Sequence, residues 1–512
     1  MTVSPAARGA SRPLRFSPSA WQLMGLDALA GAAAVTLAML LRFVDEGAVP
    51  ATYAQRLVPW IVLAALLQVG VGEVMSRLRR PGSRLGQRPV APFLIATGLS
   101  LLVVLLLNDV VLRDALSWRL PHFVAVTGPL LGAAASAALR LAAARSIDPE
   151  ELLLRRVVPL DPSVCATVLQ GKRILITGGA GSIGAELARQ VLTAGPAAVL
   201  ALDMNETALY ELEHDLAPLR GSAHFDTCIA DVTDGRRMRE LFAQERPHVV
   251  FHAAAYKHVP LVEANPDQGF VTNVLGTLAI CEAAIAAGVE RVVVISTDKA
   301  VNPSSFMGWT KRLAELIVAA SQHSTHGPLF SAVRFGNVLG SRGSVVPTLL
   351  RQIEAGGPLT ITHPDARRYF MTLSEAASLV LLSAAFGAPG GLYVLDIGDE
   401  VAIDALAERL VRLKGLRPGR DLAIAYVGLR PGEKLREELH APDERLVVTP
   451  HPAVWRIEAD YTIDGHTVFN GVRQLAAQRQ AGHLQPADYP AGVRAIVEAA
   501  VQHPGSLAAT HC

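Results

Sequence analysis

Four long apolar segments lie within the first 145 residues, and they constrain this chain more than any other feature of its sequence. They cover residues 21–41, 57–71, 91–107 and 122–139. Each is close to the length that an α-helix needs to cross a hydrocarbon layer about 30 Å thick. A cleaved leader peptide would not be followed by three more such segments. The sequence therefore predicts a four-helix transmembrane anchor over residues 1–145.

Arginines indicate on which side of the membrane the flanks of these segments lie. Three arginines precede the first segment, five lie between the second and third, and Arg145, Arg155 and Arg156 follow the fourth. The other two connections carry fewer basic residues. Because basic flanks stay on the cytoplasmic side, we expect both termini, and everything after the anchor, to be cytoplasmic.

The composition argues against a nucleic-acid partner and against a metal site. The formal net charge is +1, and no run of lysine and arginine is interleaved with aromatic residues. The four cysteines lie far apart, without a CxxC pair or a histidine cluster at metal-binding spacing. A reduced compartment without disulfides fits this pattern. The cysteines are Cys165, Cys228, Cys281 and Cys512.

After a predicted linker at 146–171, the chain reads KRILITGGAGSIGAELARQVL, which predicts a strand, a glycine turn and a helix. Glycine is needed where such a turn approaches a pyrophosphate and where the helix packs closely on the strand. Asp203 ends the next predicted strand, where a carboxylate accepts ribose hydroxyls and repels a 2′-phosphate, so NAD is favoured over NADP. The predicted contacts in the turn are Gly178, Gly181, Ser182, Ile183 and Gly184.

Further strands alternate with helices after this motif. One ends in Asp231 and Val232, which we expect near adenine, and the next runs into Ala253 and Ala254, where a cofactor can lie against the backbone. A third strand ends in the stretch STDKAVNPSSFMGWTKR. The alternation predicts an α/β fold with a doubly wound parallel sheet, whose ligands bind at the carboxyl ends of the strands.

Several motifs together resemble a known family. They are TGGAGSIG, FHAAAYKHVPLVEANP, NVLGT, STDKAVNP, VRFGNVLGSRGSVVP, THPDARRYFM and GLRPGEKL. These motifs resemble the extended short-chain dehydrogenase/reductases, and more closely the membrane-anchored nucleoside-diphosphate-sugar 4,6-dehydratases of bacterial polysaccharide biosynthesis. Longer members of this group carry an additional nucleotide-binding-like domain after the anchor. Here only the linker 146–171 separates the anchor from the predicted catalytic domain, 172–440.

The resemblance implies a lyase with tightly bound NAD at the cytoplasmic face of the bacterial inner membrane. The implied substrate is a UDP-N-acetylhexosamine, with UDP-GlcNAc first among the candidates, and the implied product is a 4-keto-6-deoxy sugar. NAD takes a hydride from C4 of the sugar, water leaves from C6, and the hydride returns to C6. We also expect a homo-oligomer.

One residue of the family pattern is replaced. Short-chain enzymes commonly carry a tyrosine four residues before the lysine that corresponds to Lys311, and here that position is Met307, which cannot carry a proton. By resemblance, Asp298 is the acid for the C6 hydroxyl, Lys299 is the base at C5, and Thr297 hydrogen-bonds the 4-hydroxyl. A partly desolvated lysine can lose its proton near neutral pH. Lys311 would hold the nicotinamide ribose, and Met307 would pack against sugar or nicotinamide.

Substrate binding is expected in the C-terminal part of the catalytic domain. Arginine suits bidentate contacts to a diphosphate, and a glutamate can accept ribose hydroxyls. The remaining segment, 441–512, is predicted to pack on the catalytic domain as an extension. The predicted substrate-binding residues are Lys257, Asn337, Ser344, His363, Arg368, Arg430 and Glu433.

Two alternatives remain open at the level of the sequence. A nucleotide-sugar 4-epimerase shares the fold, NAD and the oxidation at C4, but it needs no acid at C6, so the Asp298–Lys299 pair argues against it. A non-catalytic, NAD-binding membrane scaffold is supported only by the absent tyrosine. Product analysis with a UDP-sugar separates all three.

Overall fold

The computed structural model describes most of the chain after residue 162 and parts of the chain before it. The chain separates into two compact units, Leu14–Ile147 and a second unit that begins at Asp148. The described residues are 14–15, 20–42, 49, 58–66, 69, 124, 126–127, 130–131, 146–147, 152–153 and 163–503, apart from 222 and 324–326.

The N-terminal unit contains α1 (Ala20–Arg42), which coincides with the first predicted span. Residues 58–66, within the second predicted span, are also helical. The third predicted span, and most of the fourth, lie outside the described residues. Two short strands, β1 (Leu14–Arg15) and β2 (Ser146–Ile147), pair antiparallel.

Among the described residues, one helix is long and apolar enough to cross a membrane, and it lies in the second unit. It runs over Pro266–Ala287, and 61% of its most apolar window is buried inside the fold. The helix consists of α12 (Pro266–Gly269), the π-helical turn η5 (Phe270–Leu275) and α13 (Gly276–Ala287). Its burial against the sheet explains its apolar sequence, because a helix that is hydrophobic all round suits the core of a large domain.

The second unit is built on a nine-stranded sheet with the order β16-β17-β13-β8-β7-β6-β3-β4-β5. Seven neighbouring strands, from β13 to β5, are parallel, and β16 and β17 form an antiparallel hairpin at one edge. This topology confirms the predicted doubly wound parallel sheet. The strands are β3 (Arg173–Thr177), β4 (Ala198–Asp203), β5 (His224–Ile229), β6 (Val249–His252), β7 (Arg291–Ile295), β8 (Leu329–Arg334), β13 (Gly391–Leu395), β16 (Glu444–Val448) and β17 (Val454–Ala459).

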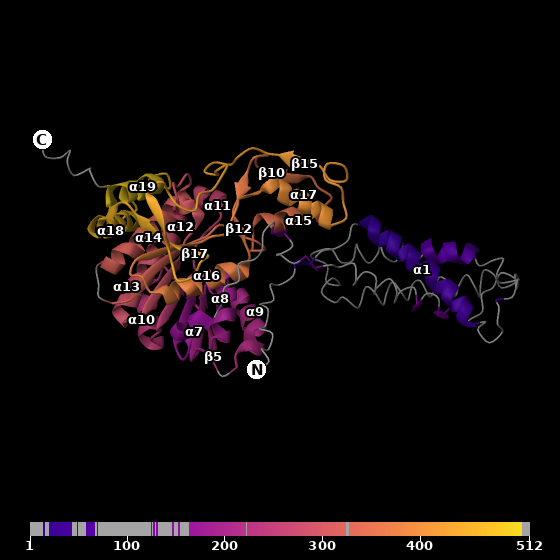
Figure 1. The fold of residues 1–512 in the computed structure, drawn as a ribbon, viewed down its shortest axis with the longest axis horizontal. Coiled ribbons are helices and arrows are strands. Elements are labelled where there is room, and N and C mark those ends of the chain that lie inside the picture. Colours follow the sequence, from indigo (N-terminus) through magenta and orange to yellow (C-terminus); the bar gives the residue numbers. More distant parts are fainter. Residues whose placement is uncertain are drawn as a thin grey trace. The chain divides into compact units, whose positions relative to one another are not determined.

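Helices cover both faces of this sheet (Figure 1). Successive side chains of a strand point to opposite faces, so Ile174 and Ile176 join one core cluster while Leu175 joins the other. One face carries α7 (Ser163–Leu169), α8 (Ser182–Thr193), α9 (Glu206–Leu216) and α16 (Leu373–Phe386). The other face carries α10 (Gly235–Glu245), α13, α14 (Phe306–His323), α18 (Gly465–Gln480) and α19 (Asp488–Ala500).

A smaller lobe lies beside the carboxyl ends of the parallel strands. It contains α15 (Val345–Glu354), α17 (Ile403–Leu413) and a parallel pair of strands, β10 (Leu359–Ile361) and β15 (Ile424–Tyr426) (Figure 1). Short strand pairs connect this lobe to the sheet. They are β9 (Asn337–Val338) with β12 (Phe370–Met371), and β11 (Arg367–Arg368) with β14 (Val401–Ala402).

Two segments that the sequence placed outside the catalytic domain pack directly on it. Within the predicted linker, α7 buries Cys165 and Leu169 in the same core cluster as α16. Within the predicted C-terminal extension, β16 and β17 extend the main sheet, and α18 and α19 pack against α14. The extension closes with β18 (Thr462–Ile463), which pairs with β19 (Val501–Gln502).

Candidate functional site

The glycine turn between β3 and α8 has the geometry that the sequence predicts. Gly178 adopts a φ of +66°, a region that other residues avoid, and a Cβ atom built there would lie 2.6 Å from the backbone nitrogen of Ala254. A Cβ atom at Gly184 would lie 2.2 Å from the carbonyl oxygen of Gly178. Helix α8 then begins without a side-chain cap at Gly181. Its first N–H groups therefore remain available to an anion.

Asp203, at the end of β4, holds the glycine turn in place. Its carboxylate accepts hydrogen bonds from the backbone N–H of Ala180 (3.1 Å) and of Asn205 (3.0 Å). Asp231 accepts from the N–H of Thr233 in a similar turn (2.8 Å), and Val232 is buried in the core. The two aspartates therefore shape the loops at the carboxyl ends of β4 and β5.

A cleft of about 460 Å³ opens at the carboxyl ends of β3, β6, β7 and β8. Its walls come from the glycine turn, from the stretch that follows β7, from the first turns of α14 and from the loop after β8. Five predicted site residues do not line this cleft: Asp203, Asp231, Val232, Ala254 and Asp298. The predicted residues that do line it are Gly178, Gly181, Ser182, Ile183, Gly184, Ala253, Lys257, Thr297, Lys299, Met307, Lys311, Asn337 and Ser344.

Directly after β7, Thr297 caps the short 3₁₀ helix η6 (Asp298–Ala300). The Thr297 hydroxyl donates to Oδ1 of Asp298 (2.8 Å), and the same oxygen accepts from Nζ of Lys299 (2.9 Å). Asp298 is 0% exposed, and its Oδ2 atom has no hydrogen-bond partner among the described residues. The carboxyl group therefore lies under the floor of the cleft, and only Thr297 and Lys299 reach the cleft itself.

Lys299 is surrounded by acceptors. Besides Asp298, its Nζ atom lies 3.2 Å from Oδ1 of Asn337 and 3.4 Å from Oε1 of Glu437. Burial lowers the pKa of Lys299, but the charges of Asp298 and Glu437 outweigh burial, so the pKa is raised above its ordinary value. This differs from the sequence-based expectation of an amine that is neutral near pH 7, because that expectation considered a single neighbouring carboxylate.

Lys311 is held differently from Lys299. It lies on α14, and its ammonium donates to the carbonyl oxygen of Ile295, the last residue of β7. Burial lowers its pKa to about 8, with Glu315 acting in the opposite direction. Met307, one turn earlier on α14, is 2% exposed, lines the cleft and belongs to the apolar core. Met307 thus has a packing environment and no polar one.

A second cleft of about 210 Å³ adjoins the first and shares Lys257, Lys299 and Asn337 with it. Arg368, Arg430 and Glu433 line this second cleft, whereas His363 lines neither. The guanidinium of Arg368 is already engaged, since it donates to the carbonyl oxygen of Lys434 (2.8 Å) and pairs with Glu433 (3.1 Å). The side chain of Arg430 is exposed.

Lys257 and Ser344 also have defined surroundings. Nζ of Lys257 donates to Oγ of Ser341 (3.3 Å), and burial, aided by the charge of Lys299, lowers its pKa. Ser344 precedes α15, and its buried hydroxyl has no partner among the described residues. Both residues line the larger cleft, and the Ser344 hydroxyl has unused hydrogen-bonding capacity.

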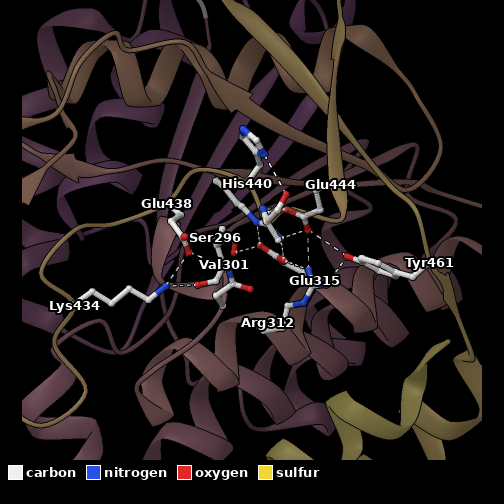
Figure 2. A network of polar contacts seen from close by, with 12 residues as sticks. Ser296, Val301, Arg312, Glu315, Lys434, Glu438, His440, Glu444 and Tyr461 are labelled. Carbon is white, nitrogen blue, oxygen red and sulfur yellow. Dashed lines mark hydrogen bonds and ion pairs between the residues drawn. The ribbon is translucent and has the colours of Figure 1, made fainter. Parts of the chain in front are cut away.

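A buried network of charges adjoins the stretch that follows β7 through Ser296 (Figure 2). The fully buried Arg334 pairs through Nε with Glu315 (2.7 Å) and through Nη1 with Glu444 (2.6 Å). Arg312 pairs with Glu315 (3.0 Å), whose Oε1 also accepts from the hydroxyl of Ser296 (2.6 Å). Two arginines thus meet two glutamates, and the network connects the end of β7, α14, β8 and the first residue of β16.

Sequence analysis missed Glu437 and this network. Glu437 follows GLRPGEKL, so proximity to a recognised motif was the only available signal. Glu315 and Arg312 share a helix with Lys311, but nothing in the sequence shows that Arg334 and Glu444 reach them.

Comparisons with known proteins agree with this architecture. A family model described as polysaccharide biosynthesis protein matches residues 174–459. Capsular polysaccharide biosynthesis protein CapD of Staphylococcus aureus is 43% identical over 320 residues, which are 62% of this chain and 53% of that protein. The chain thus spans about half the length of this curated relative.

Two further proteins are similar to this chain over most of their own length. A UDP-glucose 4-epimerase of Rickettsia rickettsii is 34% identical over 295 residues, 56% of this chain and 83% of that protein. The X-ray structure of Pen from Bacillus thuringiensis superposes with a TM-score of 0.53 at 31% identity, covering 57% of this chain and 88% of that one. Because the family model accounts for more than half of the sequence, this chain belongs to the polysaccharide biosynthesis protein family.

Proposed function

We propose that this protein is an NAD-dependent UDP-N-acetylhexosamine 4,6-dehydratase, acting on UDP-GlcNAc in bacterial surface polysaccharide biosynthesis. The observation that carries the proposal is the hydrogen-bonded Thr297–Asp298–Lys299 group at the end of β7. It supplies a hydroxyl, a carboxyl and an amine within one hydrogen-bonded unit. Elimination of water from a sugar needs such an acid and base together.

The cofactor side of the large cleft fits NAD. The glycine turn leaves no space for a Cβ atom at Gly178 or Gly184, which suits close approach of a pyrophosphate to the backbone. The start of α8 would bind that pyrophosphate, Asp203 the adenosine ribose and Lys311 the nicotinamide ribose. When bound, NAD accepts the hydride from C4 of the sugar and returns it to C6.

The catalytic residues then divide the proton transfers. Thr297 accepts a hydrogen bond from the 4-hydroxyl and passes a proton to Asp298 through their existing hydrogen bond. Asp298, whose carboxyl lies beneath the cleft floor, would give its proton to the departing C6 hydroxyl by way of Thr297, and Lys299 would remove the proton at C5. Met307 packs beside the reacting sugar and exchanges no proton.

The second cleft fits the nucleotide part of the substrate. Arg430 is the exposed guanidinium there, so it is the residue we assign to the diphosphate. Ser344, Asn337 and Lys257 donate from the shared wall. Arg368 positions Glu433, which would accept the uridine ribose hydroxyls. His363 lies outside both clefts, and its assignment to the diphosphate stays a prediction.

The N-terminal unit supports a membrane anchor. Leu29, Leu37 and Leu40 on α1 are exposed in the isolated chain, as are Val58 and Leu66 in the second apolar segment. Exposed apolar side chains on helices of this length suit contact with lipid. We therefore propose a multi-pass protein of the inner membrane with a cytoplasmic catalytic unit, and the homo-oligomer stays a prediction.

A 4-epimerase is the second candidate, because a UDP-glucose 4-epimerase is among the proteins similar to this chain. The test is NMR analysis of the product that the full-length protein, purified in detergent, forms from UDP-GlcNAc in D₂O. A dehydratase gives a 4-keto-6-deoxy sugar with solvent deuterium at C5. Exchange between UDP-GlcNAc and its C4 epimer, with no loss of water, would show an epimerase. No change to any UDP-sugar would favour a scaffold.

A further inference from the structure

If the proposed dehydratase reaction is correct, Lys299 must lose a proton before it can act as a base. Neither Thr297 nor Asp298 is free to accept that proton. In the structure Lys299 is an ammonium in contact with two carboxylates. An ammonium has no lone pair, so it cannot remove the proton at C5. Asp298 cannot accept the proton of Lys299 if it has already accepted the proton of the 4-hydroxyl through Thr297. Another acceptor must therefore lie within reach of Lys299.

Glu437 is placed to be that acceptor. Its Oε1 atom lies 3.4 Å from Nζ of Lys299 and 3.7 Å from Nε of Arg368. The residue is 4% exposed, and its Oε2 atom is buried without a partner among the described residues. A buried carboxylate usually has all its oxygens hydrogen-bonded. The unpaired Oε2 atom of Glu437, next to the proposed base Lys299, is therefore unusual and requires an explanation.

The electrostatic surroundings of Glu437 favour its accepting a proton. Burial raises the pKa of its carboxyl above the ordinary value, and Asp298 adds to this, while Lys299, Arg368 and Lys434 oppose it. Oε2 makes no hydrogen bond that would have to break, so it is free to take up a proton.

Glu437 also lies between two spaces. It lines the second cleft together with Lys299, and it lines a further cavity of about 380 Å³ together with Tyr369, Asp396 and His440. A cavity of this volume whose mainly apolar lining includes carboxylates, a phenol and an imidazole can admit water beside those groups. Glu437 can therefore exchange a proton with solvent while substrate covers Lys299.

We infer that Glu437 is a positioning residue for the base: it accepts the proton that Lys299 must lose before it acts at C5, and returns it when the reaction ends. The steps balance. The proton of the 4-hydroxyl passes through Thr297 to Asp298, and the ammonium of Lys299 gives one proton to Glu437. Lys299 then takes the C5 proton, while Asp298 gives its proton to the C6 hydroxyl, which leaves as water.

The return steps restore the starting state. Lys299 gives a proton back to C5 after the hydride has reached C6, and Glu437 gives its proton back to Lys299. The net reaction consumes no proton, and the three groups end as one ammonium and two carboxylates. Without Glu437, Lys299 would have to lose its proton to bulk solvent in each cycle.

The test is the pH profile of turnover in Glu437→Gln, using the full-length protein in detergent with NAD and UDP-GlcNAc. Glutamine keeps the shape of the side chain but cannot accept the proton. We expect kcat at pH 7 to fall about a hundredfold or more, as for loss of a proton-transfer group, with little change in KM. We also expect kcat of the variant to rise steadily with pH, because hydroxide in solvent can then deprotonate Lys299.

Two variants control this test. Glu437→Asp keeps a carboxylate and should restore most of kcat and the flatter profile of the wild type. Glu438→Gln alters the neighbouring glutamate, which contacts Lys434 (Figure 2) and Asn302, and should leave kcat unchanged. Thermal unfolding of each variant shows whether it is folded.

Four outcomes would overturn the inference. If Glu437 only holds Lys299 in its charged form, Glu437→Gln will raise kcat at pH 7. If Glu437 has only a structural role, Glu437→Asp will lower kcat as much as Glu437→Gln does. Neither substitution will then change the shape of the pH profile. Wild-type protein that makes no keto sugar would overturn the proposed function as well, whereas normal turnover with an unaffected Glu437→Gln overturns this inference alone.

Discussion

Two buried groups of charges lie side by side behind the end of β7, and they differ in how completely their atoms are paired. In the network of Arg312, Glu315, Arg334 and Glu444, two positive charges meet two negative charges, and no buried side-chain nitrogen or oxygen of these four residues lacks a partner. In the group of Asp298, Lys299 and Glu437, one ammonium meets two carboxylates, and one oxygen of each carboxylate has no partner among the described residues.

This difference separates a structural role from a chemical one. A fully paired buried network fixes the positions of the elements that it joins. A buried group with an excess of carboxylate oxygens can accept a proton without breaking an existing hydrogen bond, so its members are suited to proton transfer. The structural network adjoins the chemical group through Ser296, which bonds Glu315 and immediately precedes Thr297.

The largest effect is expected from the chemical group. Asp298→Asn and Lys299→Met should each lower kcat for UDP-GlcNAc by about a thousandfold to ten-thousandfold, because each removes a proton-transfer group. Asp298→Asn should lower the unfolding temperature little, since it removes a buried, incompletely paired charge, whereas Lys299→Met leaves two buried carboxylates without their ammonium and should lower it. Steady-state kinetics and thermal unfolding of the same preparations measure both. A large loss of stability with unchanged kcat would reverse the roles of the two groups.

A large effect on stability is expected from the structural network. Arg334→Met removes the residue that pairs with both Glu315 and Glu444. Breaking such a buried pair leaves uncompensated charge and costs about 3 to 5 kcal/mol. Urea unfolding followed by tryptophan fluorescence gives the change in the free energy of unfolding. A loss below about 1 kcal/mol would mean that water or rearrangement replaces the arginine.

The pH dependence of stability sharpens the comparison. Burial alone would raise the pKa of Glu444, but Arg334 and Arg312 outweigh burial and lower it from 4.5 to about 2. Its contribution to stability is therefore fully present above pH 4.5 and is lost as the pH falls toward 2. The linkage amounts to about 3 kcal/mol. The difference in unfolding free energy between wild type and Glu444→Gln should narrow by that amount between pH 6 and pH 2, whereas a constant difference would contradict the ion pairing.

The smallest effect concerns Lys311, which belongs to neither group. Its pKa of about 8 lies below its ordinary value because burial disfavours the charge. The charged form therefore costs stability below pH 8, and that cost disappears as the pH rises above 8. Lys311→Met removes the buried charge but leaves the carbonyl of Ile295 without its donor. We expect a net gain of about 1 kcal/mol at pH 7, together with weaker NAD binding by fluorescence titration. Loss of stability would show that the hydrogen bond outweighs burial.

Local sequence patterns were sufficient for much of the fold and for part of the site. The doubly wound sheet follows from alternating strands and helices, and the glycine turn follows from three glycines at fixed spacing. The stretch from Thr297 to Lys299 was recognisable because it directly follows a strand. Asp203 lies at the end of β4, as predicted. The sequence did not show that its carboxylate accepts hydrogen bonds from the backbone N–H groups of Ala180 and Asn205.

Contacts between distant segments were not predictable in the same way. Arg368 was expected to bind phosphate, but in the structure it holds the loop of Glu433 and Lys434, because the short β11 strand brings it under that loop. The predicted linker contributes α7 to the core, because Cys165, Val168 and Leu169 form an apolar stripe too short to be distinctive in sequence.

By itself, the sequence determined the order of strands and helices and the glycine turn, because each depends on residues within a few positions of one another, and by resemblance it predicted Asp298 and Lys299 as an acid–base pair. Only the tertiary structure decided how that pair is charged. Glu437 reaches Lys299 from a distant loop, and its charge raises the pKa that burial would otherwise lower. Electrostatic effects depend on distance in space and on burial, and neither is set by separation along the chain.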